Sequence, residues 1–331
     1  MAGSSSSSTA TNLISTVHHD IIESHILTRL DGPTLASFSC ASSHLHELAS
    51  NELLWSKLRR STWPSTAAFS DDGSICPKNS SNNGSRLFFS DAYSVLDAAG
   101  SVSDPHRPFP ELISAVDVHY RGKLILSRVV KTETTTAWFR TSPLRIDLVD
   151  PKDAVPTPIK RGRWTDDTCR DLEQELALSW IVIDPVGKRA ANLSSHRPVS
   201  VRRNWLSGGV EAKFATVVGS VECVITVVTC GEEEMHVKEV SLRVEKMEGT
   251  HLNGEDSLVI LRSVMEGKRG NGSRREMESK RRHEEFMEKK REVKEKKMRV
   301  DLVFDILTVA VGILGFVSLV GFYLWSRRTL M

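Results

Sequence analysis

Histidine and acidic side chains gather near the start of the chain, where they could bind a metal ion. His18, His19, Glu23 and His25 lie close together, and His19 and Glu23 are four residues apart, on one face of a predicted helix. A zinc site needs three or four ligands at suitable spacing, and no third ligand follows here. We therefore interpret these residues as a solvated or partner-facing polar face and expect no metal site.

Motifs of the common catalytic classes are absent from the sequence. It contains no G-x-S-x-G, no G-x-x-x-x-G-K-[ST] phosphate loop, no H-E-x-x-H and no dinucleotide fingerprint. Trp138, Trp164, Trp180 and Trp205 could form a sugar-stacking platform, as in lectins, but we expect them in a hydrophobic core. These observations favour a protein that is not an enzyme and that needs no cofactor.

Charge and cysteine content narrow the possible partners and the compartment. The chain has 331 residues, with 44 Lys and Arg against 42 Asp and Glu, so its formal net charge of +2 gives no general attraction to nucleic acid. Its five cysteines are widely spaced and form no C-x-x-C pair, which argues against a zinc site and a disulfide framework. Reduced thiols fit the cytosol. We expect residues 1–12, which are rich in serine, to be a disordered tail.

Apolar residues at helical spacing between residues 17 and 58 predict three short helices. The first runs up to Asp31-Gly32-Pro33, where one helix ends and the next begins with proline in its first turn. The second carries Leu35 and Cys40, and the third runs from Leu45 to Leu58. A unit of roughly 40 residues is marginally stable alone. It must therefore pack against the rest of this chain or against a partner.

This pattern resembles an F-box, within predicted boundaries of residues 13–60. Val17-His18 stands where that family has Leu-Pro, and Leu45 stands where an aromatic residue is frequent. Leu48 matches the motif, as do nine residues that the resemblance assigns to adaptor binding. With Val17, the predicted adaptor-binding residues are Asp20, Ile21, Ile26, Leu27, Leu30, Leu35, Cys40, Leu53 and Trp55. The alternative is an ordinary helical subdomain packed on the domain that follows.

The opposite end of the chain predicts a membrane span. Ile306–Trp325 contains no charged residue over a length that can cross a bilayer as a helix, and we place the span at residues 302–325. Seven Lys and Arg residues crowd residues 289–299, whereas only Arg327 and Arg328 follow the span, which predicts that the N-terminal part is cytosolic. Only six residues follow Trp325, as in a tail-anchored protein.

The segment before the span is strongly charged. We expect KRGNGS, residues 268–273, to be a hinge, and residues 266–300 to contain a solvated helical stalk without an apolar stripe. Favourable pairs four residues apart, such as Glu278 and Arg282, would support that helix. Its basic excess could bind anionic lipid beside the bilayer. A nuclear import signal is the less favoured alternative.

Residues 112–265 alternate mostly with period two and predict a β-rich domain. Val116, Val118 and Tyr120 alternate with polar residues, and more continuous apolar runs such as LSWIVID and SLVILR predict buried strands. A helix is expected at Asp167–Leu178, and another at residues 87–99 in a helical and loop region spanning 61–111. The predicted fold class is therefore α+β, with a sandwich-like sheet domain between the F-box and the C-terminal helices.

The β-rich region adds a second resemblance. LSWIVIDPVGKRAANLSSHRPVSVRRNWL and VKEVSLRVEKMEGTHLNGEDSLVILRS are similar to the C-terminal domain of a group of plant F-box proteins, and some members, including the cytokinin-induced ones, also end in a membrane span. The resemblance implies a substrate receptor of an SCF-type cullin-RING ubiquitin ligase. Its partners would be a Skp adaptor (ASK in plants), a cullin through that adaptor, an unknown protein substrate and membrane lipid.

Two other functions stay open at this point. The chain could be a tail-anchored lectin-like or lipid-binding module without a ligase, or a hydrolase whose site carries no recognisable motif. Binding of an adaptor would distinguish the first hypothesis from both of these.

Overall fold

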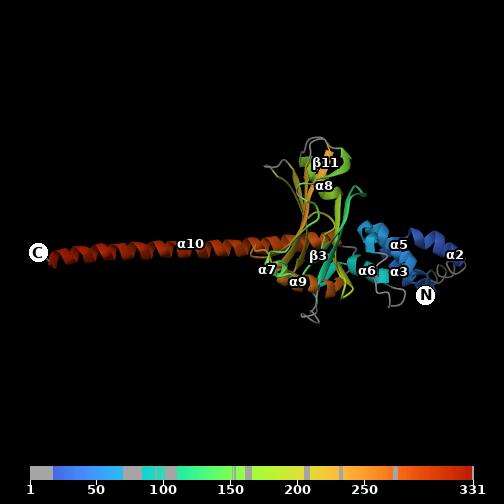
Figure 1. Cartoon of the computed structure of the whole chain (residues 1–331), viewed down its shortest axis with the longest axis horizontal. Coiled ribbons are helices and arrows are strands. Elements are labelled where there is room, and N and C mark those ends of the chain that lie inside the picture. The colour runs from blue at the N-terminus through green and yellow to red at the C-terminus, as the bar shows by residue number, and fades with distance from the viewer. Residues whose placement is uncertain are drawn as a thin grey trace, which may run out of the picture.

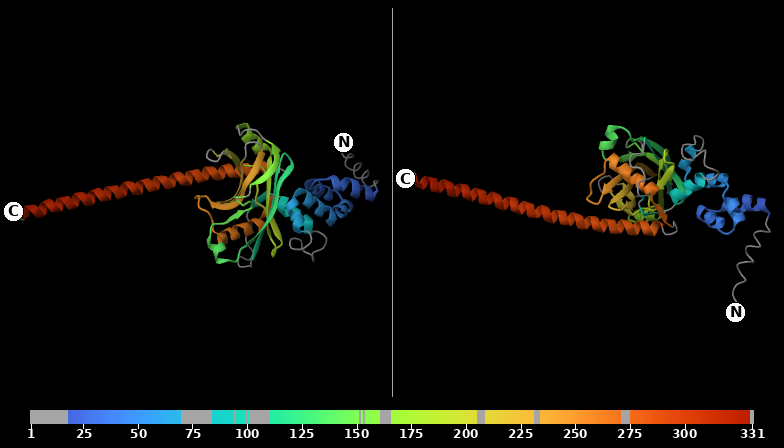
Figure 2. Two further views of the ribbon diagram at one scale, coloured as in Figure 1. Left: turned by 45° about the horizontal axis from the view of Figure 1, so that its top comes forward. Right: turned by 90° about the horizontal axis from the view of Figure 1, so that it is seen from below.

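Figure 1 shows the computed structural model, in which a helical N-terminal region, a β-rich middle and one long C-terminal helix follow one another in space. The structure describes residues 18–69, 84–93, 95–98, 100, 110–150, 152, 154–160, 166–204, 209–230, 234–270 and 275–329. Val17, Trp164, Trp205 and the serine-rich tail at residues 1–12 lie outside the described residues. Figure 2 shows that the helical region and the long helix leave the β-rich part on opposite sides.

The N-terminal region is built from short helices, each begun by a side chain that caps it. The carboxylate of Asp31 accepts a hydrogen bond from Thr34 N, Ser42 from Leu45 N, and Asn51 from Leu53 N. The cap at Asn51 divides the predicted third helix into two. The elements are α2 (His19–Ile21), the π-helical turn η1 (Ile22–Ile26), the 3-10 turn η2 (Leu27–Arg29), α3 (Gly32–Ser39), α4 (Ser43–Ala49), α5 (Glu52–Thr62), η3 (Pro64–Phe69) and α6 (Gly84–Tyr93).

Helix α6 closes these helices through an aromatic cluster. The ring of Phe89 lies 5.5 Å from Trp55 and 5.0 Å from Trp63, and it stacks on Tyr93 at 5.3 Å. Position 32 must be glycine, because a Cβ there would lie 2.1 Å from the Phe89 ring. Trp63 is buried as well. Residues outside the F-box motif therefore complete its core.

Two antiparallel sheets form the β-rich part. The four-stranded sheet has the order β3 (Lys123–Glu133), β2 (Glu111–Tyr120), β6 (Leu176–Asp184) and β7 (Arg189–Asn192). The six-stranded sheet has the order β4 (Arg145–Asp147), β11 (Glu234–Lys246), β10 (Val221–Cys230), β9 (Val210–Val218) and β8 (Ser200–Arg203), with β5 (Val155–Lys160) also paired to β11. One buried apolar cluster contains side chains from both sheets.

The four-stranded sheet is covered on both faces. Val116 of β2 and its partner Trp180 of β6 belong to the cluster shared with the six-stranded sheet. The neighbouring pair Ala115 and Ile181 belongs to a second cluster, which contains the buried side chains of the N-terminal helices. Successive side chains of a strand point to opposite faces, so β2 and β6 are apolar almost continuously. The helical region therefore packs against the rest of this chain, one of the two supports that its small size requires.

A buried carboxylate joins the two regions at this contact. Asp117 of β2 is fully buried and accepts hydrogen bonds from the backbone N and the hydroxyl of Ser65, at 3.0 and 2.6 Å. Burial raises the pKa of the Asp117 carboxyl, while the hydrogen bonds from Ser65 and Ser127 oppose that rise. Burying a charged carboxylate costs free energy unless its oxygens accept hydrogen bonds. The two hydrogen bonds from Ser65 therefore hold η3 against the sheet.

Two segments differ from the sequence-based expectation. SLVILR lies in helix α9 (Gly254–Glu266) and is not a strand, because Asn253 caps a helix there by accepting a hydrogen bond from Asp256 N at 2.7 Å. The helix predicted at residues 87–99 ends at Tyr93, and β1 (Val95–Ala98) follows it. Helix α8 (Asp166–Glu175) is confirmed but ends before Leu176, where β6 begins. The short helix α7 (Ala137–Thr141) was not predicted.

The predicted hinge and the predicted solvated stalk are both corrected by the structure, which has the strand β12 (Lys268–Gly270) and the helix α10 (Arg275–Thr329) there. β12 pairs with β1, so Lys268–Gly270 is not a hinge. The first turns of α10 dock on the β-rich part: His283 contacts Glu222 at 2.5 Å, Lys290 contacts Glu245 at 3.1 Å, and Phe286 is only 2% exposed. The predicted pair Glu278–Arg282 is present at 2.7 Å. α10 is thus a docked helix over its first four turns and an exposed one beyond them.

We predict that Asp117→Asn stabilises the protein at pH 7, because asparagine keeps an acceptor for Ser65 without the cost of a buried charge. Folding raises the pKa of Asp117, so the wild-type protein loses stability relative to this variant as the pH rises above about 4, the pKa of an unfolded aspartate. Urea unfolding of detergent-solubilised full-length protein between pH 4 and pH 7 measures the difference. The exposed Asp20→Asn is the control and should show no such trend.

We predict that Phe286→Ala loosens the docked turns of α10, since it removes a buried ring worth about 3–5 kcal/mol in a core. Hydrogen exchange of residues 276–290 should become faster, while exchange in β2 and β6 stays unchanged. Met287→Ala, at the neighbouring and exposed position, is the matched control. Equal exchange in the two variants would contradict the docking role of Phe286.

Candidate functional site

The residues assigned to adaptor binding divide into an exposed and a buried group. Ile21, Ile26 and Leu53 are 49%, 38% and 79% exposed, which is unusual for large apolar side chains. Asp20 and Cys40 are also exposed, and Leu30 is half-buried. We call Ile21, Ile26 and Leu53 the exposed apolar set. These three residues are the ones available to a partner without rearrangement.

The buried group holds the helices together. Leu27, Leu35 and Trp55 lie in the cluster shared with α6 and the four-stranded sheet, and Trp55 Nε1 donates a hydrogen bond to Ala49 O at 2.6 Å. Direct contact of Leu27, Leu35 and Trp55 with an adaptor stays a prediction, and in the described structure these three side chains pack inside the chain. Periodicity could not separate the two groups, because part of the cover comes from outside the motif, as with the Phe89 ring that lies 5.5 Å from Trp55.

Polar side chains border the exposed apolar set. Asn51 Nδ2 donates a hydrogen bond to Glu23 Oε1 at 2.7 Å, which ties the start of α5 to η1. His19 Nδ1 lies 3.8 Å from Glu23 Oε2. No cluster of three metal-binding side chains occurs among the described residues. Glu23 thus positions the first helical turns against α5.

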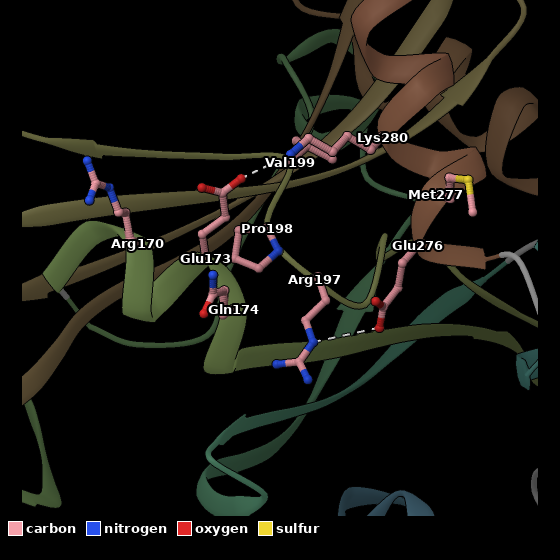
Figure 3. A pocket seen from close by; sticks show the side chains of 9 residues that line it. All are labelled: Arg170, Glu173, Gln174, Arg197, Pro198, Val199, Glu276, Met277 and Lys280. Atoms are coloured by element: carbon pink, nitrogen blue, oxygen red, sulfur yellow. Dashed lines mark hydrogen bonds and ion pairs between the residues drawn. The ribbon is translucent and has the colours of Figure 1, made fainter. Parts of the chain in front are cut away.

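A second candidate site is a pocket of about 530 Å³ between α8, the segment before β8 and the first turns of α10. Figure 3 shows two ion pairs across it: Lys280 with Glu173 at 3.1 Å, and Arg197 with Glu276 at 3.6 Å. Both pairs link α10 to other walls of the pocket. Its lining consists of Arg170, Glu173, Gln174, Arg197, Pro198, Val199, Glu276, Met277 and Lys280.

Sequence reasoning missed this pocket. Glu276 and Lys280 are four residues apart and could pair along the helix, whereas each contacts a residue of the β-rich part. The available signal was the spacing of Glu276, Lys280, His283 and Lys290, which places charged groups on one face of α10. On the same helix, hydrogen bonds from Arg281 and Arg282 lower the pKa of Glu278 to about 2.

The tryptophans do not gather into a platform in the described part of the chain. Trp180 is fully buried and donates a hydrogen bond from Nε1 to Ser114 Oγ at 3.2 Å, which confirms its predicted core position. Trp138 of α7 is 78% exposed, so the core prediction is wrong for this residue. The next residue of the same short helix, Phe139, is buried in its place.

Helix α10 is long and apolar enough in its C-terminal half to cross a membrane, judged by length and composition. None of its most apolar window is buried against the protein. Figure 1 shows this half projecting away from the β-rich part as a continuous helix. The apolar side chains of this window are therefore exposed in the described part of the chain.

Comparison with known proteins places this architecture in a family. The chain is 77% identical over 328 residues to a probable F-box protein of Arabidopsis thaliana, covering 98% of this chain and 99% of the relative. Two further F-box proteins of Arabidopsis thaliana are 42% and 41% identical, over 94% and 96% of this chain and 96% and 92% of their own lengths. No family model and no solved structure matches. Near-complete coverage at this identity shows that the chain belongs to the plant F-box protein family.

Proposed function

We propose that this protein is the substrate-receptor subunit of an SCF-type ubiquitin ligase and binds a Skp-type adaptor through the exposed apolar set. The observation that carries the proposal is the exposure of Ile21, Ile26 and Leu53, three large apolar side chains at positions of the F-box resemblance. Apolar side chains that remain exposed after the fold is complete favour a protein partner. Asp20, next to Ile21 in the sequence, and Cys40 are also exposed, and we include both in the proposed surface.

The contact between helices and sheet supports this role mechanically. A substrate receptor forms no bond with ubiquitin, and it works by holding substrate lysines near the loaded conjugating enzyme. That geometry needs a fixed angle between the adaptor surface and the substrate domain. The shared cluster around Ala115 and Ile181, with the Asp117–Ser65 hydrogen bonds, supplies such a fixed connection.

We further propose that the apolar half of α10 anchors the receptor in a membrane, with the helical and β-rich parts in the cytosol. The exposed apolar surface of that half and the basic residues before it support the anchor and the orientation. The resemblance to the cytokinin-induced subgroup, whose members end in such a span, agrees with this arrangement. A nuclear location is less favoured, because a membrane span follows the basic residues directly.

We predict that Ile26→Ala combined with Leu53→Ala weakens binding of a purified Skp-type adaptor by about 1–3 kcal/mol, since both side chains would be buried in the complex. Titration calorimetry on the full chain in detergent measures the change. Leu87→Ala on α6 is the matched control, because Leu87 is equally apolar and 60% exposed but lies outside the proposed surface. Failure of the wild-type chain to bind any Skp-type adaptor would contradict the proposal itself.

We predict that the full-length protein stays in the membrane fraction after carbonate and high-salt washes, because the retention of the apolar half of α10 is hydrophobic. A chain ending at Arg299 should be released into the soluble fraction. Protease added outside intact microsomes should digest the β-rich part. Extraction of the full-length protein by salt would rule out the anchor, and protection of the β-rich part would reverse the orientation.

A further inference from the structure

The pocket beside α10 has an uneven charge balance. Three of its lining residues are cationic and two are anionic, and the anions are already matched: Glu173 with Lys280, and Glu276 with Arg197. Arg170 is the remaining cation. It is 77% exposed, and its ion pair is with Asp167, 3.5 Å away and outside the pocket lining.

The position of Arg170 leaves it available to a ligand. Figure 3 shows it near the outer end of the drawn part of α8, apart from the two ion pairs. Its pair with Asp167 joins two strongly exposed side chains on one helix, and such pairs contribute little because water competes for both partners. An anion on a ligand can therefore replace Asp167 at small cost, and guanidinium groups bind carboxylates and phosphates in a two-point geometry.

The rest of the lining adds an apolar component. Pro198, Val199 and Met277 provide apolar surface, and Met277 is largely exposed and can adjust its side chain to a ligand. The volume of about 530 Å³ is within the range of sites that take a few side chains or a small molecule. From this combination we propose that the pocket binds a short peptide segment of the substrate in which an anionic residue is followed or preceded by apolar ones, with Arg170 as the anion contact.

The position of the pocket along α10 favours a peptide ligand over a lipid headgroup. Lys280 precedes Ile306 by 26 residues on one continuous helix, which corresponds to about 39 Å along the helix axis. Membrane helices tilt by about 20° on average, and this angle shortens the distance only slightly. With the apolar half of α10 in a bilayer, the pocket lies far beyond the headgroup layer and faces cytosolic protein.

This inference rests on the proposed substrate-receptor function, and its test measures the two separately. Pools of octapeptides, with a central residue fixed as glutamate, phosphoserine, glutamine or lysine, are titrated by fluorescence anisotropy against the full chain in detergent. The glutamate or the phosphoserine pool should bind up to about fivefold more tightly than the lysine pool, the gain expected for one exposed ion pair. Whichever pool binds identifies the source of the anion.

Arg170→Glu should abolish that preference, whereas Arg140→Glu on α7, an equal charge change at another exposed arginine, should preserve it. Equal affinity for all pools in the wild-type chain, or an unchanged preference in Arg170→Glu, would overturn the proposal. So would binding of short-chain phosphatidylserine, in place of the peptides, that depends on Arg170. Adaptor binding is measured on the same preparations: adaptor binding without a peptide preference refutes the pocket alone, and loss of adaptor binding refutes the receptor function.

Discussion

The four-stranded sheet is the element on which the rest of the structure depends, because both of its faces are buried. Val116 and Trp180 face the six-stranded sheet, and Ala115 and Ile181 face the N-terminal helices. The N-terminal helices and the six-stranded sheet each have an apolar face that must be buried, and the four-stranded sheet buries both. Burial of a sheet on both faces excludes water from the contact, and a change on one face is transmitted to the packing of the other.

This constraint explains why the helical region can be so small. The short helical elements from α2 to α5, about 40 residues in all, bury too little surface to be stable alone, and α6 with the sheet supplies the remainder. The buried carboxylate of Asp117 also fixes the orientation of η3 on the sheet, because Ser65 can donate both hydrogen bonds to it in only one orientation. A receptor that must present a substrate at a fixed angle benefits from both features.

Helix α10 connects the β-rich part with the proposed anchor, and its docked turns explain its charge pattern. Basic residues on one face meet acidic residues of the sheets, as in Lys290 with Glu245, while Phe286 fills the contact between them. The same turns form one wall of the pocket. One helix would therefore set both the substrate contact and the direction of the membrane anchor that we propose.

The sequence by itself determined the short N-terminal helices, the strands of alternating pattern and the apolar C-terminal helix, because these depend on local spacing and turn chemistry. It could not decide that SLVILR is helical, since a short apolar run fits a buried strand equally well until Asn253 is seen to cap a helix. Only the tertiary structure decided that Leu35 and Trp55 face inward while Leu53 stays exposed, and that Arg170 and Lys280 border one pocket. These facts depend on contacts between residues far apart in the chain, which periodicity does not encode.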